Sequence, residues 1–206
     1  MVANRAKLKL AVLISGRGSN LQSLIDACDD ADYPVEIVTV VSNVPGVQGL
    51  DKAEAAGIET TVIDHTAFDG REAFENALHD AISASGAEFV CLAGFMRMLT
   101  GGFVGKWRDR MINIHPSLLP DYKGLHVHER VVEAGEKFSG CTVHFVVPDL
   151  DSGPIIVQAK VPVEPGDDAD TLAARVLDEE HKILPEAVRL IAEDRVSVDG
   201  DRVIIT

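Results

Sequence analysis

The stretch LKLAVLISGRGSN, residues 8–20, places an apolar run directly before a loop that contains two glycines. A near-continuous apolar run is typical of a parallel strand that is buried on both faces. Leu21, Leu24 and Ile25 follow at helical spacing. The stretch therefore predicts a strand, a tight loop and a helix, and the free N–H groups at the start of that helix favour an anion.

The glycines of this loop do not complete a dinucleotide fingerprint. Gly16 and Gly18 allow the backbone to turn and to approach a ligand closely. A dinucleotide site has a third glycine where this chain has Leu21. It also has an acidic residue at the end of the second strand, where Ser42 and Asn43 stand. NAD is therefore not expected.

The residues alone leave two interpretations of the loop open. A lone GxG is a weak signal and fits a simple tight turn. Alternatively, the loop binds one phosphate through the backbone amides of Gly18, Ser19 and Asn20. Arg17 can add positive charge, but such a site does not depend on it.

The same alternation of apolar runs and helical patterns continues along the chain, and it predicts a single domain over residues 1–206. Parallel strands are expected at 8–14, 35–42, 59–63, 88–94 and 111–115. After residue 124 two strands, 140–147 and 154–163, lie close in sequence and favour antiparallel pairing; a helix at 170–193 and a hairpin at 196–205 follow. The predicted class is α/β, an open, mostly parallel twisted sheet with helices on both faces and an antiparallel addition in the C-terminal half.

The charge of the chain limits its partners. It carries 33 acidic and 19 basic residues, a net charge of −14, so nucleic acid and anionic membranes are not expected as partners. No apolar stretch approaches the ~20 residues of a membrane span, and no signal peptide is visible, so a cytoplasmic location is expected. Cys28, Cys91 and Cys141 lack metal spacing and are expected to be reduced, buried thiols. An oligomer stays compatible with this sequence.

A polar pair interrupts the apolar strand MINIH, residues 111–115. Asn113 and His115 are two positions apart, so both point to one side of the strand at its C-terminal end. Ligands of open parallel sheets bind beyond these ends. An amide that donates to a developing oxyanion, with a histidine that moves a proton, suits acyl transfer directly onto an amine. The alternative is that His115 is a structural histidine.

Three further polar positions have two interpretations each. Asp151, in the turn PDLDSG, is either an ordinary turn residue or a carboxylate that favours the imidazolium form of a nearby histidine. His144 is either a core histidine or a residue near the site. His126 and His128 form an H-x-H without a third ligand, so they are expected to be surface or supporting groups, and no metal is expected.

Four motifs together resemble the folate-dependent phosphoribosylglycinamide formyltransferases. They are NIHPSLLPDYKG (113–124), GRGSN (16–20), LAGFMRML (92–99) and LDSGPII (150–156). The resemblance extends from about residue 8 to 192. It implies transfer of a formyl group from 10-formyltetrahydrofolate to the amine of phosphoribosylglycinamide in purine biosynthesis. It also implies a phosphate-binding half at about 8–105 and a folate-binding, catalytic half at about 106–206.

The resemblance also implies a role for individual residues. Asn113, His115 and Asp151 would be the catalytic trio, and Asn113 would touch the formyl group itself. The acceptor phosphate would lie on Gly18, Ser19 and Asn20, with Glu180 toward the ribose and glycinamide end. The folate would be bound by Arg71 and by the backbone of Met96, Arg97, Met98 and Leu99.

Related formyltetrahydrofolate enzymes are expected to use the same set of Asn, His and Asp residues. A formyltetrahydrofolate hydrolase is expected to carry an additional N-terminal domain, and a transferase acting on methionyl-tRNA an additional C-terminal domain and a less acidic surface. A sugar-nucleotide transferase is another rival, although the monophosphate loop favours a small ribonucleotide. A non-catalytic binding module would not need all three polar residues, and an oxidoreductase would need the missing fingerprint.

Overall fold

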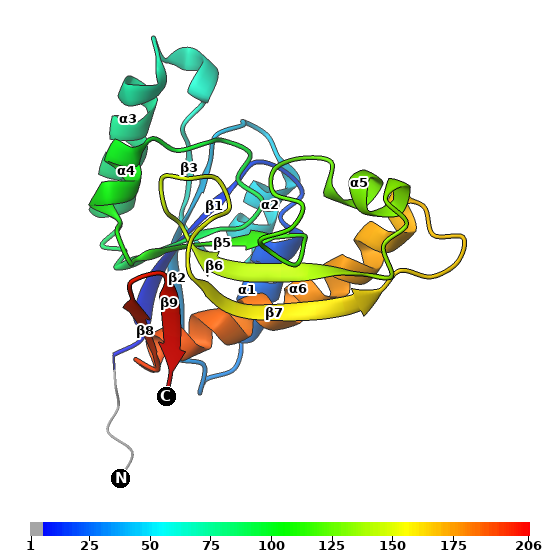
Figure 1. Cartoon of the computed structure of the whole chain (residues 1–206). Coiled ribbons are helices and arrows are strands. Elements are labelled where there is room, and N and C mark those ends of the chain that lie inside the picture. The colour runs from blue at the N-terminus through cyan, green and yellow to red at the C-terminus, as the bar shows by residue number, and fades with distance from the viewer. Residues whose placement is uncertain (1–5) are drawn as a thin grey trace.

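Five parallel strands make up most of the central sheet, and the computed structural model describes residues 6–206. They are β1 (Leu8–Ile14), β2 (Val35–Ser42), β3 (Thr60–Val62), β4 (Phe89–Leu92) and β5 (Met111–His115). Two antiparallel strands extend the sheet, β6 (Phe138–Phe145) and β7 (Ile155–Pro162). The order is β3-β2-β1-β4-β5-β6-β7 (Figure 1). This confirms the mostly parallel sheet with its antiparallel addition.

Helices cover both faces of the sheet, as expected for strands that are apolar on both sides. They are α1 (Ser19–Cys28), α2 (Gln48–Ala55), α3 (Arg71–Ala84), α4 (Gly101–Lys106), α5 (Val127–Glu133) and α6 (Ala169–Ala192), with a short 3-10 helix, η1 (His65–Ala67). One hydrophobic core lies under α1, α2, α5 and α6. The other lies under α3 and α4, which pack side by side in Figure 1. The C-terminal hairpin, β8 (Val196–Asp199) with β9 (Arg202–Ile205), confirms that prediction too.

The strand order reverses between β1 and β4, and this reversal creates a place for ligands. The chain moves from β1 to β2 and β3 in one direction, and then returns to place β4 on the other side of β1. The loop after β1 leads to α1 on one face, whereas the loop after β4 leads to α4 on the other. Loops that diverge in this way leave a crevice beyond the C-terminal strand ends.

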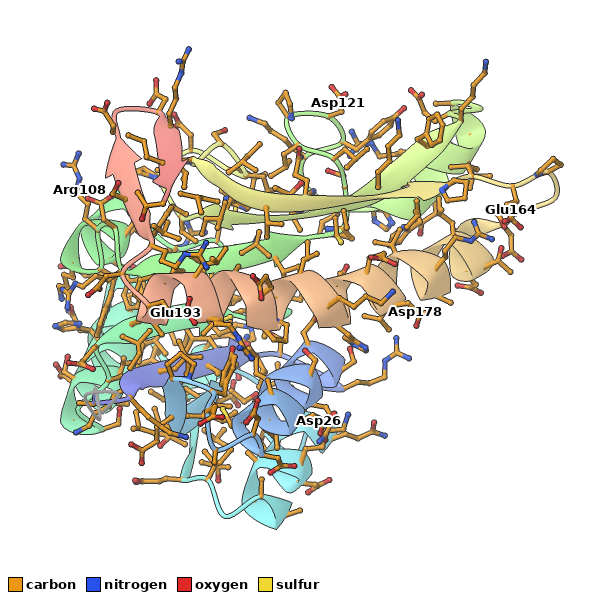
Figure 2. All side chains as sticks on the ribbon, turned by 90° about the horizontal axis from the view of Figure 1, so that it is seen from below. Asp26, Arg108, Asp121, Glu164, Asp178 and Glu193 are labelled. Atoms are coloured by element: carbon orange, nitrogen blue, oxygen red, sulfur yellow. The ribbon has the colours of Figure 1, made fainter. Side chains whose placement is uncertain are left out.

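The long helix α6 lies beside α1 and carries a buried residue toward the glycine loop. Its start is stabilised by a capping box in which the Asp168 carboxylate accepts from the Thr171 amide at 2.8 Å. Figure 2 shows α6 alongside α1, with Asp178 on α6 and Asp26 on α1 at the surface. Glu180, by contrast, faces inward and is only 7% exposed. The helix therefore separates a solvated acidic face from a face that reaches the site.

The cysteines are all free thiols, as the sequence suggested. Cys91 and Cys141 are buried, and burial raises the pKa of each thiol to about 12. Cys28 differs from the expectation, because its position at the end of α1 leaves it only partly buried. Among residues 6–206, no helix is long and apolar enough to cross a membrane.

Candidate active site

The three expected catalytic residues converge at the C-terminal end of β5. His115 Nδ1 lies 3.5 Å from Asp151 Oδ2, and the two side chains are only 7% and 9% exposed. Asn113 shares the strand with His115 and pairs in register with His144 of β6. His144 Nε2 in turn lies 3.8 Å from the other carboxylate oxygen of Asp151. β6 thus adds a second histidine, His144, to the cluster. The spacing of residues along β5 had predicted only Asn113 and His115.

His144 determines how the Asn113 amide is oriented. Its Nδ1 lies 2.8 Å from the Phe145 carbonyl, to which it donates, and in the neutral ring Nε2 is then the accepting nitrogen. The Asn113 amide nitrogen lies 3.3 Å from that Nε2 and donates to it. Burial lowers the pKa of His144, which also favours the neutral ring. His144 is therefore buried, as the core interpretation expected, and it also contacts Asn113 and Asp151.

A loop after β5 contacts both His115 and Asp151. His115 Nε2 lies 3.0 Å from the carbonyl oxygen of Tyr122, and the Gly124 amide donates to Asp151 Oδ2 at 2.9 Å. Both ring nitrogens of His115 consequently face an oxygen acceptor, Asp151 Oδ2 at Nδ1 and the Tyr122 carbonyl at Nε2. The carbonyl of Tyr122 is a contact that no sequence pattern indicated.

The glycine loop ends at the first residue of α1, where the backbone amides are free of a side-chain cap. Gly18 adopts φ +67° at the N-cap, a left-handed conformation that glycine adopts without strain. A Cβ on Gly18 would lie 2.7 Å from the Cα of Gly49, so a larger residue is also excluded by contact with α2. Lys52 donates to the Gly18 carbonyl at 3.3 Å. The loop is thus held tightly, with cationic charge nearby.

Glu180 is brought to this loop from far away in the sequence. The Asn20 amide donates to Glu180 Oε2 at 2.6 Å, across 160 positions of the chain. Burial raises the pKa of Glu180, and the hydrogen bond from Asn20 opposes that rise. No local pattern could have paired these residues; only the family resemblance pointed to Glu180.

The residues expected to bind folate lie on the loop after β4, the strand beside β5, and at the start of α3. Met96 and Met98 are 66% and 56% exposed, and the Met96 amide already donates to the Ser15 hydroxyl at 2.7 Å. Arg97 and Leu99 are half-buried. Arg71 is exposed at the start of α3, and within the described part of the chain no hydrogen bond or ion pair connects it with the trio.

His126 and His128 do not form a metal centre with their neighbours. His126 is exposed and lies 3.5 Å from Glu129, and His128 is half-buried on α5. Over residues 6–206, no group of three or more His, Cys, Asp or Glu side chains is placed to hold a metal ion.

An amide, an imidazole and a carboxylate gather beyond the strand ends, with a glycine loop at the start of α1 on the same edge, and this arrangement suits a group-transfer enzyme. A family model described as formyl transferase matches residues 8–188. The chain belongs to the formyl transferase family. Within that family its similarity is to phosphoribosylglycinamide formyltransferases.

Three comparisons support this placement. The phosphoribosylglycinamide formyltransferase of Escherichia coli is 45% identical over 93% of this chain and 90% of its own length. A glycinamide ribonucleotide transformylase structure from Symbiobacterium toebii superposes with a TM-score of 0.94 at 44% identity, covering 97% of this chain and 94% of that one. The trifunctional purine biosynthetic protein adenosine-3 of Bos taurus is 52% identical over 92% of this chain. The chain spans only 19% of the length of that trifunctional relative.

Proposed function

We propose that this chain transfers the formyl group of 10-formyltetrahydrofolate to the amine of 5'-phosphoribosylglycinamide, a step of purine biosynthesis. The observation that carries the proposal is the His115–Asp151 pair, 3.5 Å apart and nearly buried beside Asn113. This arrangement has the donors that a tetrahedral oxyanion needs, and it has a carboxylate beside the imidazole that can orient the ring.

Each substrate has a separate region along the strand ends. The acceptor phosphate binds to the amides of Gly18, Ser19 and Asn20, and Glu180 faces the ribose and glycinamide end. The contact between Asn20 and Glu180 supports this assignment, because it puts both residues in one region. The pteridine binds to the backbone from Met96 to Leu99, with Arg71 on the cofactor side. The exposure of Met96 and Met98 agrees with a surface that a folate covers.

The reaction follows from direct attack by the amine. The glycinamide nitrogen adds to the formyl carbon, and the carbonyl oxygen becomes an oxyanion that accepts from the Asn113 amide. It also accepts from His115 Nε2–H, which exchanges the Tyr122 carbonyl for the oxyanion while Nδ1 stays at Asp151. One such donor typically contributes on the order of 10²–10³ in rate. A proton leaves the attacking amine and a proton reaches the folate nitrogen, with Asp151 and His115 as the relay. The carbon–nitrogen bond to the folate then breaks, and the formyl group stays on the glycinamide amine.

The orientation of Asn113 supports its role. One N–H of its amide donates to His144 Nε2, which leaves the second N–H for the formyl oxygen. The charge stabilisation comes from the amide and the imidazolium, so the proposal needs no metal ion.

The test is formation of the folate product, followed by absorbance, with and without phosphoribosylglycinamide. Wild type is compared with Asp151→Asn and with the matched control Asp149→Asn, an exposed residue of the same loop. We expect product only with the acceptor, a loss of about 10²–10⁴ in turnover in Asp151→Asn, and normal turnover in the control.

Other outcomes separate the rival activities. Product released without any acceptor would show a formyltetrahydrofolate hydrolase. Folate binding without product in either condition would show a non-catalytic binding module. Equal turnover in both aspartate variants would remove Asp151 from the mechanism.

A further inference from the structure

One hydroxyl group connects three loops at the edge of the sheet where ligands are expected. Ser15 is the first residue after β1, and its side chain lies between the loops that follow β2 and β4. Its Oγ accepts from the Met96 amide at 2.7 Å and donates to Asn43 Oδ1 at 2.5 Å. Asn43 is 2% exposed, so the hydroxyl binds a buried partner.

The Ser15 hydroxyl has two protein partners, and the direction of one bond is fixed by chemistry. A backbone N–H can only donate, so the hydroxyl oxygen accepts from Met96. The other partner is the side-chain amide of Asn43, which bonds the hydroxyl through Oδ1 and also lies beside His65 Nδ1, 3.1 Å from the amide nitrogen. His65 Nδ1 in turn lies 2.9 Å from the backbone carbonyl of Asn43. Ser15 is therefore held between a backbone donor and a buried side-chain amide.

The hydrogen bond between Ser15 and Met96 joins the two loops that are proposed to bind the two substrates. The loop after β1 starts at Ser15 and carries the amides of Gly18 to Asn20, and the loop after β4 carries residues 96–99. β1 and β4 are neighbours in the sheet, but the loops that follow them lead to opposite faces. Beyond the strand ends the two loops are therefore not joined by strand pairing, and a crevice lies between them. A hydrogen bond from one loop to the other at the base of the crevice limits how far they can separate.

We infer that Ser15 is a positioning residue that holds the acceptor loop and the folate loop in a fixed relation. The inference rests on the proposed function. Without the hydroxyl, the Met96 amide and the Asn43 amide oxygen lose their partner, and the loop at 96–99 and the first turn of the glycine loop can move apart. In this inference Ser15 affects both substrates through the two loops that bind them.

The experiment measures binding of each substrate separately by calorimetry, with phosphoribosylglycinamide and with 10-formyl-dideazafolate as the folate probe. Ser15→Ala removes the hydroxyl, and Ser15→Thr keeps it. Ser85→Ala is the matched control, because Ser85 Oγ bonds the Ile82 carbonyl at 2.7 Å at the end of α3, away from the crevice. Deuterium exchange of the peptide that contains Met96 reports on the loop independently of any ligand.

We expect Ser15→Ala to raise the dissociation constants of both ligands by about 3- to 10-fold, the range of one hydrogen bond. The Met96 peptide should exchange faster, Ser15→Thr should restore binding, and Ser85→Ala should change neither ligand. If Ser15→Ala does not fold, Ser15→Cys, which has nearly the same size and a weaker donor, gives the same readouts.

A loss for one ligand alone, or a lower melting temperature with both affinities intact, would overturn the inference and leave Ser15 a local structural residue. Wild-type protein that binds neither ligand would overturn the proposed function, and this inference with it. Wild-type binding of both ligands with unchanged binding in Ser15→Ala would refute the inference alone.

Discussion

Gly153 offers a direct test of how accurately Asp151 must be placed. A Cβ on Gly153 would lie 1.8 Å from the Phe145 carbonyl oxygen and 3.4 Å from Val147 Cγ1. The first contact is to backbone, which cannot rotate away as a side chain does. Because the Phe145 amide also donates to the Pro154 carbonyl at 2.9 Å, the loop is attached to β6 at this point.

Gly153→Ala therefore requires the loop to move away from β6. Real Cβ contacts are not shorter than 3.0 Å, so the shift is at least about 1.2 Å in a close-packed interior. Asp151, two residues away, lies 3.5 Å from His115 Nδ1 and would lose this contact. A displacement of ~1 Å at a catalytic group can cost about 10²-fold in rate. We expect a turnover loss of that size and a stability loss of about 1–3 kcal/mol from overpacking.

The assay is steady-state formyl transfer together with thermal unfolding. Gly105→Ala is the control, because a Cβ there meets no atom within 4 Å and the residue is exposed in α4. The control should keep full turnover and gain about 0.5–1 kcal/mol of stability from alanine in a helix. Full turnover in Gly153→Ala, with a melting temperature like that of wild type, would refute the close approach of this loop to β6.

Two further substitutions test the acceptor side. Burial raises the pKa of Glu180, so the native state binds this proton more tightly than the unfolded chain, and stability falls as the pH rises above about 4.5. Glu180→Gln should therefore have a higher melting temperature than wild type at pH 7, and this difference should become smaller toward pH 4. A difference in melting temperature that stays constant over this range would show that ionisation of the buried carboxyl is not its cause. Gly49→Ala would place a Cβ 2.5 Å from Ile14 Cδ1 and 3.3 Å from Gly18 Cα. It should raise KM for phosphoribosylglycinamide and leave KM for folate unchanged, and equal changes in both constants would disprove the assignment of this loop to the acceptor.

The strands and helices were largely predictable because their signals are local. The bounds of β1, β2 and β5 match the prediction, and in β1 and β2 the apolar run is continuous and is flanked by turn residues. The other sheet strands differ from it by at most two residues at each end. Antiparallel pairing of β6 and β7 was predictable from the short connection, because a parallel pair needs a long crossover.

The sequence by itself determined the alternating α/β pattern, and it determined that Asn113 and His115 share one face, because side-chain direction along a strand depends only on spacing. Only the tertiary structure decided which residues join them. His144 reaches Asn113 through the register of β5 and β6, and Asp151 reaches His115 through the return of the loop between β6 and β7. Contacts of this kind depend on strand order and on crossovers. Their partners lie far apart along the chain, where local periodicity carries no information.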